Sequence, residues 1–160
     1  FDILILNPIF GIKKKNDFSD KIIAKSLRFM EKKYPRIVFL KLWSSFHYAG
    51  PREALHHMNI REKLSFDYFY IGRDHAGAQN IYGVNAASNI SKIYRDKFII
   101  NSITSRGGYY CKNCEDYVIK GKCKHKNLFN ISGTEFRLCL SKNKKYIHAD
   151  KELQNLIING

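Results

Sequence analysis

The sequence is poor in acidic side chains and has no long apolar run. Its 160 residues contain 14 Asp+Glu against 28 Lys+Arg, giving a formal net charge of +14. No apolar run reaches the roughly 20 residues that a membrane-spanning helix needs, and no N-terminal signal pattern is present. Excess positive charge is typical of proteins that bind nucleic acid, an anionic membrane surface or phosphorylated compounds. A solvated, lysine-rich surface accounts for it equally well.

Cysteine is scarce as well, with four residues in the chain, three of them clustered from Cys111 to Cys123. A chain of this length can bury about 68–70% of its unfolded surface, so it does not need a disulfide framework. Hydrophobic residues make up 44% of the sequence and aromatic residues 14%, which excludes a disordered chain. The chain opens with Phe1 inside an apolar run, so we expect the natural polypeptide to begin upstream.

Hydrophobic patterning alternates between strand-like and helix-like segments. A helix that follows residue 17 has apolar residues at helical spacing, can be capped by Asp17 or Ser19, and stops at Pro35. The order of elements favours an α/β fold with a parallel sheet flanked by helices. The sequence predicts strands over 1–6, 37–42, 66–71 and 97–100, helices over 17–34, 51–64, 85–95, 134–140 and 151–158, and an irregular segment over 104–130.

In such folds, ligands bind beyond the carboxyl ends of the strands, where the connecting loops open the next helices. One such loop has the sequence GRDHAG over 72–77, in which glycines allow close backbone approach and Arg73 suits phosphate. An ordinary turn with an Arg73–Asp74 ion pair is the alternative. A second loop, YAGPREA over 48–54, follows the preceding strand, and Arg52 or Arg61 could reach an anion there. His56 and His57 point about 100° apart on a helix, so we interpret them as surface or packing residues.

A third motif, ISGTEFR over 131–137, places Ser132 or Thr134 at a helix start. The free N–H groups of that helix start suit phosphate, and Arg137 would lie on the same face as Thr134. A simple capped helix is the alternative interpretation.

The fourth motif is the pattern Cys111-x2-Cys114-x8-Cys123-x-His125. Three thiolates and one imidazole at this spacing match a tetrahedral zinc site, and four protein ligands leave no open position for catalysis. We therefore predict a structural zinc, with His125 as the least certain ligand because Cys-x-His is a tight spacing. Cys139 is interpreted as a buried thiol.

Taken together and in this order, YAGPREA, GRDHAG, the Cys/His knuckle and ISGTxxR resemble the ATP sulfurylase family, the sulfate adenylyltransferases. The resemblance runs from about Leu6 to the end of the chain. It implies a Rossmann-like nucleotidylyltransferase sheet with a zinc-knuckle insertion at 109–126. It also implies a catalytic domain over 1–140 and a C-terminal helical tail over 141–160.

The resemblance implies that AMP is transferred from ATP to sulfate, giving adenosine 5′-phosphosulfate and pyrophosphate, or the reverse. Mg²⁺ would accompany ATP, and structural Zn²⁺ would hold the knuckle. Arg73, Asp74 and His75 would be catalytic, and the backbone of Ala76 would face sulfate. The ATP and phosphate site would comprise Gly72, Arg73, Asp74, His75, Gly77, Ser132, Thr134 and Arg137. The resemblance further suggests a homo-oligomer. Reduced thiolates and the absence of a signal pattern favour a cytoplasmic setting, no membrane partner is expected, and nucleic acid is not the favoured partner.

Two departures from the family keep an alternative open. The family motif QxRNPxHxxH, expected just before Phe1, and the PUA-like domain ahead of it lie outside this sequence. His47 stands where the family usually has Arg before YAG. The alternatives are a degenerate, noncatalytic nucleotide-binding or interaction module of the same fold, and a nucleic-acid-binding protein suggested by the charge and the knuckle.

Overall fold

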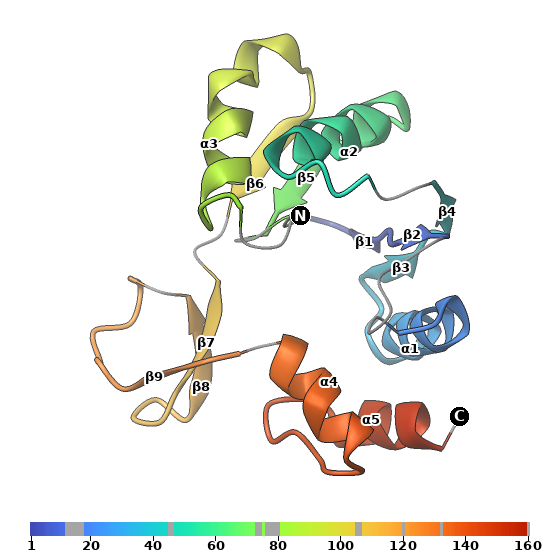
Figure 1. The fold of residues 1–160 in the computed structure, drawn as a ribbon, viewed down its shortest axis with the longest axis vertical. Coiled ribbons are helices and arrows are strands. Elements are labelled where there is room, and N and C mark those ends of the chain that lie inside the picture. The colour runs from blue at the N-terminus through green and yellow to red at the C-terminus, as the bar shows by residue number, and fades with distance from the viewer. Residues whose placement is uncertain are drawn as a thin grey trace. The chain divides into compact units, whose positions relative to one another are not determined.

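The computed structural model describes residues 1–11, 18–44, 47–72, 75, 81–104, 107–119, 121–131 and 133–159 (Figure 1). Contacts between residues divide the chain into two compact units. The first unit comprises Phe1–Phe46 together with Ser132–Gly160, and the second unit comprises His47–Ile131. The predicted division into a catalytic domain over 1–140 and a tail over 141–160 stays a prediction.

The first unit is built around parallel strand pairs joined by a helix. Strand β1 (Leu4–Leu6) pairs with β3 (Ile37–Phe39), and β2 (Ile9–Phe10) pairs with β4 (Leu42–Trp43), both in parallel. Helix α1 (Asp20–Lys33) forms the crossover between them. This arrangement confirms the predicted α/β class, because parallel neighbours need such a crossover.

Local signals in the sequence explain where α1 begins and ends. Ser19 caps the helix, its Oγ accepting a hydrogen bond from the N–H of Ile22 at 3.3 Å. Basic Lys32 and Lys33 occupy the last turn, where they complement the helix dipole, and the helix ends before Pro35. The predicted cap is therefore confirmed at Ser19. Asp17, the other candidate, lies outside the described residues.

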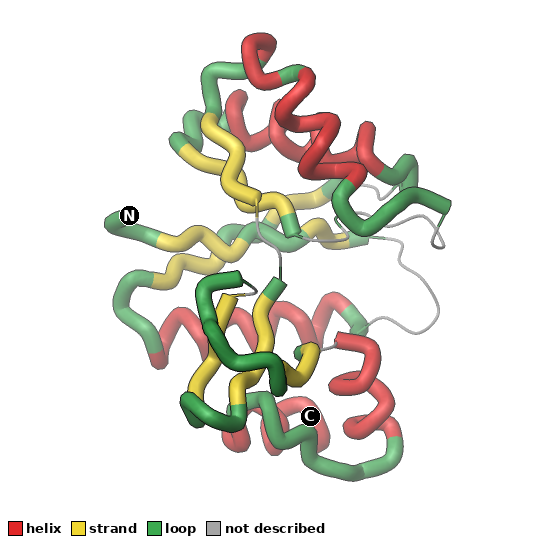
Figure 2. The backbone as a smooth tube through the Cα atoms, turned by 90° about the vertical axis from the view of Figure 1, so that its left-hand side faces the viewer, coloured by secondary structure: helices red, strands yellow, loops and turns green. Residues whose placement is uncertain are grey.

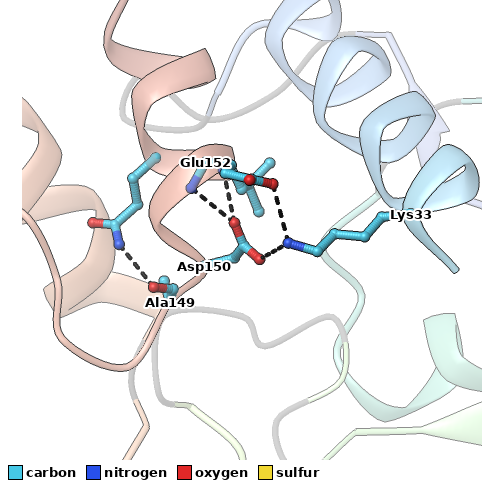
Figure 3. Close-up of polar contacts among 6 residues, drawn as sticks. Lys33, Ala149, Asp150 and Glu152 are labelled. Carbon is cyan, nitrogen blue, oxygen red and sulfur yellow. Dashed lines mark hydrogen bonds and ion pairs between the residues drawn. The ribbon is translucent and has the colours of Figure 1, made fainter.

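Two further helices, α4 (Gly133–Ser141) and α5 (Lys151–Ile158), complete the first unit. Figure 3 shows Lys33 of α1 reaching the carboxylates of Asp150 and Glu152 at the start of α5. Gln154, only 1% exposed, uses its amide to accept from the N–H of Tyr146 and to donate to the carbonyls of Tyr146 and Ala149. This fully bonded amide fixes the loop before α5 onto the helix.

The second unit begins with a parallel strand pair and its helices. Strand β5 (Tyr68–Ile71) pairs in parallel with β6 (Asn101–Thr104), and α3 (Ala86–Ile93) lies between them in the chain. Helix α2 (Pro51–Lys63) packs against α3, and both belong to the upper group of helices in Figure 2. A small core of Ala54, Ile71 and Ala87, with Phe69 packed against it, joins these elements.

The predicted strand over 97–100 is wrong, because this segment contains the short 3₁₀ helix η1 (Arg95–Lys97) and a bend. The carboxylate of Glu62 accepts the backbone N–H groups of Ile99 and Ile100, at 2.6 and 3.0 Å. These N–H groups are therefore satisfied by a side chain instead of a strand ladder. The observed strand, β6, begins at Asn101, directly after the predicted segment.

The segment over 104–130 is more regular than the sequence predicts. Strands β7 (Gly108–Cys111), β8 (Asp116–Ile119) and β9 (Leu128–Asn130) form an antiparallel sheet with β7 in the centre. Polar, lysine-rich connections separate these short strands and hid the sheet, since the usual alternation of apolar and polar residues is too short to recognise. Among the described residues, the helices are all too short or too polar to traverse a bilayer.

Candidate active site and metal centre

The YAGPREA motif forms the entrance to α2. Pro51 occupies the first turn, where its fixed φ suits a helix start, and Gly50 precedes it with a φ of +62°. A Cβ on Gly50 would lie 2.3 Å from Cε2 of Tyr82. Glycine is therefore required here both by the backbone angle and by the approach of an aromatic ring.

Glu53 ties this entrance loop to the helix. Its carboxylate accepts the N–H of His47 at 3.0 Å through Oε1 and the N–H of Ala49 at 2.9 Å through Oε2. Glu53 is three residues after Gly50, so the contact is a variant of the capping box in which the acidic side chain reaches back over the helix start. At 2% exposure, this carboxylate is part of the interior.

Three ionisable residues line one buried face of α2. Glu53, His57 and Arg61 recur every fourth residue and are 2%, 4% and 5% exposed. The guanidinium of Arg61 donates to the carbonyl of His57 at 3.4 Å and lies 5.6 Å from the ring centroid of Phe69. Buried charges of this kind are costly unless they are paired or bound, so such clusters are candidates for functional sites.

His75 of the GRDHAG loop meets this face. Its Nε2 lies 3.1 Å from Nδ1 of His57, and the two rings meet edge to face with centroids 5.3 Å apart. The opposite contact of His75 is with Phe69, at 5.5 Å between centroids. The structure thus joins the GRDHAG loop to the helix that begins in YAGPREA through a pair of imidazoles.

Burial and neighbouring positive charge keep both imidazoles neutral at pH 7. Burial, with contributions from His75 and Arg61, lowers the pKa of His57 to about 3. Burial and Arg61 also lower the pKa of His75, against a smaller opposing effect of Glu53. The permanent cation on this face is therefore Arg61.

The remaining predicted site residues fall into three groups. Gly72 follows β5 and has open space where a Cβ would stand. Thr134 and Arg137 lie on α4 of the first unit, with Nη2 of Arg137 at 3.5 Å from Oγ1 of Thr134, as expected for residues on one helix face. Arg73, Asp74, Ala76, Gly77 and Ser132 lie outside the described residues.

Sequence reasoning did not assign a site role to Glu53 or His57. It interpreted both neighbouring histidines as surface or packing residues, and the structure leaves His56 exposed while burying His57. The i, i+4, i+8 spacing of Glu53, His57 and Arg61 was the available signal, because residues four apart share a helix face.

A separate cluster of Cys111, Cys114, Cys123 and His125 lies at the β7–β8–β9 sheet. Cys111 ends β7, Cys114 is in the turn before β8, and the other two precede β9. Their four ligand atoms all lie within 4.8 Å of one another. The structure therefore brings together all four predicted metal ligands. Cys139, interpreted from the sequence as a buried thiol, is a partly buried free thiol on α4.

The spacing of the ligand atoms fits a tetrahedral ion. Zinc with ordinary bond lengths places its sulfur ligands about 3.8 Å apart and sulfur and nitrogen about 3.6 Å apart. Here the Sγ atoms of Cys114 and Cys111 lie 3.8 and 3.6 Å from that of Cys123. Nδ1 of His125 lies 3.5, 3.3 and 3.5 Å from the three sulfurs in chain order. The Cys/His cluster can therefore hold one metal ion with all four positions filled.

Crowding of the thiols gives the same indication. Hydrogen bonding to Cys111 and Cys123 raises the pKa of the Cys114 thiol to about 11. Burial raises the pKa of Cys111, but hydrogen bonds, those to Cys114 foremost, outweigh it and lower that pKa to about 7. Three thiolates at this distance repel one another, and a divalent cation at their centre would remove that repulsion.

Comparison with known proteins identifies the class. The family model of ATP-sulfurylase matches residues 1–149. Sulfate adenylyltransferases of Ignicoccus hospitalis and Pyrococcus abyssi are 38% and 35% identical over 149 residues, which are 90% of this chain and 39% of each relative. The sulfate adenylyltransferase of Carboxydothermus hydrogenoformans is 34% identical over 150 residues, again 39% of its length.

A solved structure described as a hexameric APS kinase from Thiobacillus denitrificans resembles this fold, with a TM-score of 0.74 and 14% identity. The match covers 98% of this chain and 30% of that chain, and at this identity it concerns the fold alone. The family match is much more specific. The chain belongs to the ATP-sulfurylase family. It spans about two fifths of the length of the curated relatives that it matches.

Proposed function

We propose that the chain takes part in adenylyl transfer between ATP and sulfate, giving adenosine 5′-phosphosulfate and pyrophosphate, or the reverse. The observation that carries this proposal is the family match over residues 1–149. Support from the geometry comes from the second unit, where the buried face of α2 meets the GRDHAG loop through His57 and His75.

The chemistry needs positioning and positive charge more than proton transfer. Sulfate is fully ionised at neutral pH, so it needs no general base to attack the α-phosphorus of ATP. The obstacle is the approach of a dianion to a polyanion, which fixed cations and N–H dipoles overcome. Mg²⁺ bound to the ATP phosphates would neutralise part of that charge.

By resemblance, the residues of the two phosphate motifs divide this work. Arg73 neutralises phosphate, Asp74 holds the nucleotide or the loop, and the N–H of Ala76 faces sulfate. His75, together with Arg73, contacts phosphate in the family pattern. The remaining nucleotide-binding residues are Gly72, Gly77, Ser132, Thr134 and Arg137.

Zn²⁺ is the ion we propose for the Cys/His cluster. Three thiolates and one imidazole are the donor set of structural zinc sites, and a filled tetrahedron leaves no place for substrate. Bound zinc would stabilise the β7–β8–β9 sheet, which contains few buried side chains. This structural role is independent of the adenylyl-transfer step.

Self-association into a homo-oligomer is part of the same proposal. It rests on the resemblance to the family; the structurally similar APS kinase is itself described as hexameric. Sedimentation of the native polypeptide would test it, and a monomer at micromolar concentration would contradict it.

The test of function is sulfate-dependent exchange of labelled pyrophosphate into ATP, with Mg²⁺ and Zn²⁺ present. It is run on the 160-residue chain and on the native polypeptide in which the chain occurs. We expect exchange in the native polypeptide, lost in Arg73→Gln and retained in Arg36→Gln, which changes an exposed arginine. ATP binding without exchange in both samples would instead establish a noncatalytic nucleotide-binding module. Failure to bind ATP at all would overturn both functions.

A further inference from the structure

We propose that His57 is a positioning residue that holds His75 in one neutral tautomer, with the proton on Nε2. The GRDHAG loop would then present Nδ1 of His75, a hydrogen-bond acceptor, to its ligand. The identity of that ligand as a nucleotide rests on the proposed function, whereas the tautomer does not.

The order of protons follows from the atoms that face one another. Oε1 of Glu53 lies 3.5 Å from Nε2 of His57, an ion-pair distance that is not a hydrogen bond, and the carboxylate attracts a proton on that nitrogen and repels a lone pair there. The proton of a neutral His57 is therefore favoured on Nε2, which leaves a lone pair on Nδ1. That Nδ1 lies 3.1 Å from Nε2 of His75, a distance that needs one proton between the two nitrogens. Nε2 of His75 must supply it.

Electrostatics around the pair exclude a charged alternative. The residues that act on His57 are Arg61, His56 and His75, with His47 from the segment before α2. Glu53 faces Nε2 of His57, and Phe69 of β5 packs edge to face with the ring of His75. A proton added to either ring would place a second cation beside the buried guanidinium of Arg61.

This arrangement determines what His75 can bind. A neutral ring that accepts through Nδ1 repels a fully ionised phosphate oxygen at that nitrogen, which departs from the phosphate contact that the resemblance implies for His75. It favours a donor, such as a hydroxyl or amino group of a nucleoside or a backbone N–H of the loop. Positive charge for the phosphates would then come from arginine side chains, and His75 would select or orient the nucleoside.

The experiment is nitrogen NMR of the chain with labelled histidine, recorded between pH 8 and 5. We expect His75 to show a protonated Nε2 and an unprotonated Nδ1 at pH 7 and above. His57→Asn retains an acceptor near the position of Nδ1 and should keep this tautomer. His57→Leu removes the acceptor and should give a mixture of tautomers. His56→Leu changes an exposed histidine of the same helix and serves as the control.

A protonated Nδ1 or a doubly protonated ring on His75 of the unaltered chain at pH 7 would overturn the proposal. An unchanged tautomer in His57→Leu would overturn it too. If His57→Leu does not fold, the unaltered chain and His57→Asn still decide the question.

ATP affinity is measured separately by calorimetry. Loss of one oriented hydrogen bond should weaken binding about 3- to 10-fold in His57→Leu, with recovery in His57→Asn. Equal affinity in all three proteins would overturn the role of His57 in presenting His75. The tautomer is read without turnover, so absence of adenylyl transfer would refute the proposed function and leave this result intact.

Discussion

Nζ of Lys33, in the last turn of α1, lies 2.6 Å from Oδ2 of Asp150, the residue that caps α5. The other carboxylate oxygen of Asp150 accepts the N–H groups of Glu152 and Leu153. One carboxylate therefore both starts a helix and holds it to a helix 117 residues earlier in the chain. Hydrogen bonding to Asp150 and Glu152 raises the pKa of Lys33 to about 12, and bonding to Lys33 lowers the pKa of Asp150.

We expect Asp150→Asn to destabilise the chain less than Asp150→Ala, because asparagine keeps the cap and loses the charge. The difference between the unaltered chain and Asp150→Asn should be present above pH 3.8 and disappear as the pH falls through the lowered pKa of Asp150. Urea unfolding at several pH values measures it, with Glu152→Gln as the control for a more exposed carboxylate. Equal midpoints for the two Asp150 variants would refute the separate capping contribution.

Metal removal should affect the Cys/His cluster first. We expect one Zn²⁺ per chain by elemental analysis, and chelation should reduce amide protection in β7, β8 and β9 before other strands. Co²⁺ in place of zinc should give the absorption of a tetrahedral thiolate site, lost in Cys114→Ser and kept in Cys139→Ser. Retention of the metal in Cys114→Ser would exclude the four-ligand site.

Glu62 should stabilise the approach to β6. In Glu62→Ala, the N–H of Ile100, a residue only 2% exposed, loses its acceptor. The expected loss is about 1–3 kcal/mol of unfolding free energy, the usual cost of an unsatisfied buried donor. Lys63→Ala, on the next, exposed residue, should change the free energy by less than about 0.5 kcal/mol. Similar values for both variants would show that the Glu62 contact contributes nothing.

Gly50 of YAGPREA and Gly72 of GRDHAG should respond differently to substitution by alanine. Gly50→Ala combines a strained φ of +62° with a clash against Tyr82, and should cost about 1–3 kcal/mol or more. Adding Tyr82→Ala should recover the part due to the clash. Gly72→Ala meets open space and should unfold like the unaltered chain, so any loss of ATP affinity there reports close approach of the ligand. A destabilised Gly72→Ala would remove that interpretation.

The neutral state of His57 should make the second unit sensitive to acid. Its pKa is about 3 in the folded chain against 6.5 ordinarily, so the unfolded chain binds an additional proton between these values. Stability should therefore fall as the pH decreases from 6.5 towards 3, and the fall should be shallower in His57→Asn. Thermal unfolding in a pH series measures the slope, and His56→Asn should retain the slope of the unaltered chain. Equal slopes in all three proteins would contradict the assignment.

Elements with strong local signals were predictable from the sequence. Helix α5 was expected over 151–158 and occupies Lys151–Ile158, because Asp150 caps an amphipathic run. Helix α2 was marked at its start by Pro51. The strand expected at 97–100 failed because Glu62, distant in sequence, captures its N–H groups. The antiparallel sheet of β7–β9 was not predicted, because its register depends on cross-strand pairs, such as Tyr110 opposite Tyr117 and Phe129.

Site residues were likewise predictable where the signal was local and not predictable where it depended on tertiary packing. Ligand spacing in the sequence was sufficient to identify the four residues of the Cys/His cluster, since short loops bring them together. The contact of His57 with His75 was not predictable, because it depends on how α2 packs beside β5. Propensity carries no information on that packing.

Helix α2 also fixes the spacing of three buried side chains along one face. Glu53, His57 and Arg61 follow one another at intervals of four residues, and each interval corresponds to about 6 Å of helix rise. A residue inserted between Glu53 and Arg61 would turn every later side chain by about 100°. The entrance loop and the GRDHAG loop would then lose their common partner while the composition of the helix stayed nearly the same. Length, more than identity, is the constraint on this segment, and natural variants should keep its phase even where its exposed residues diverge.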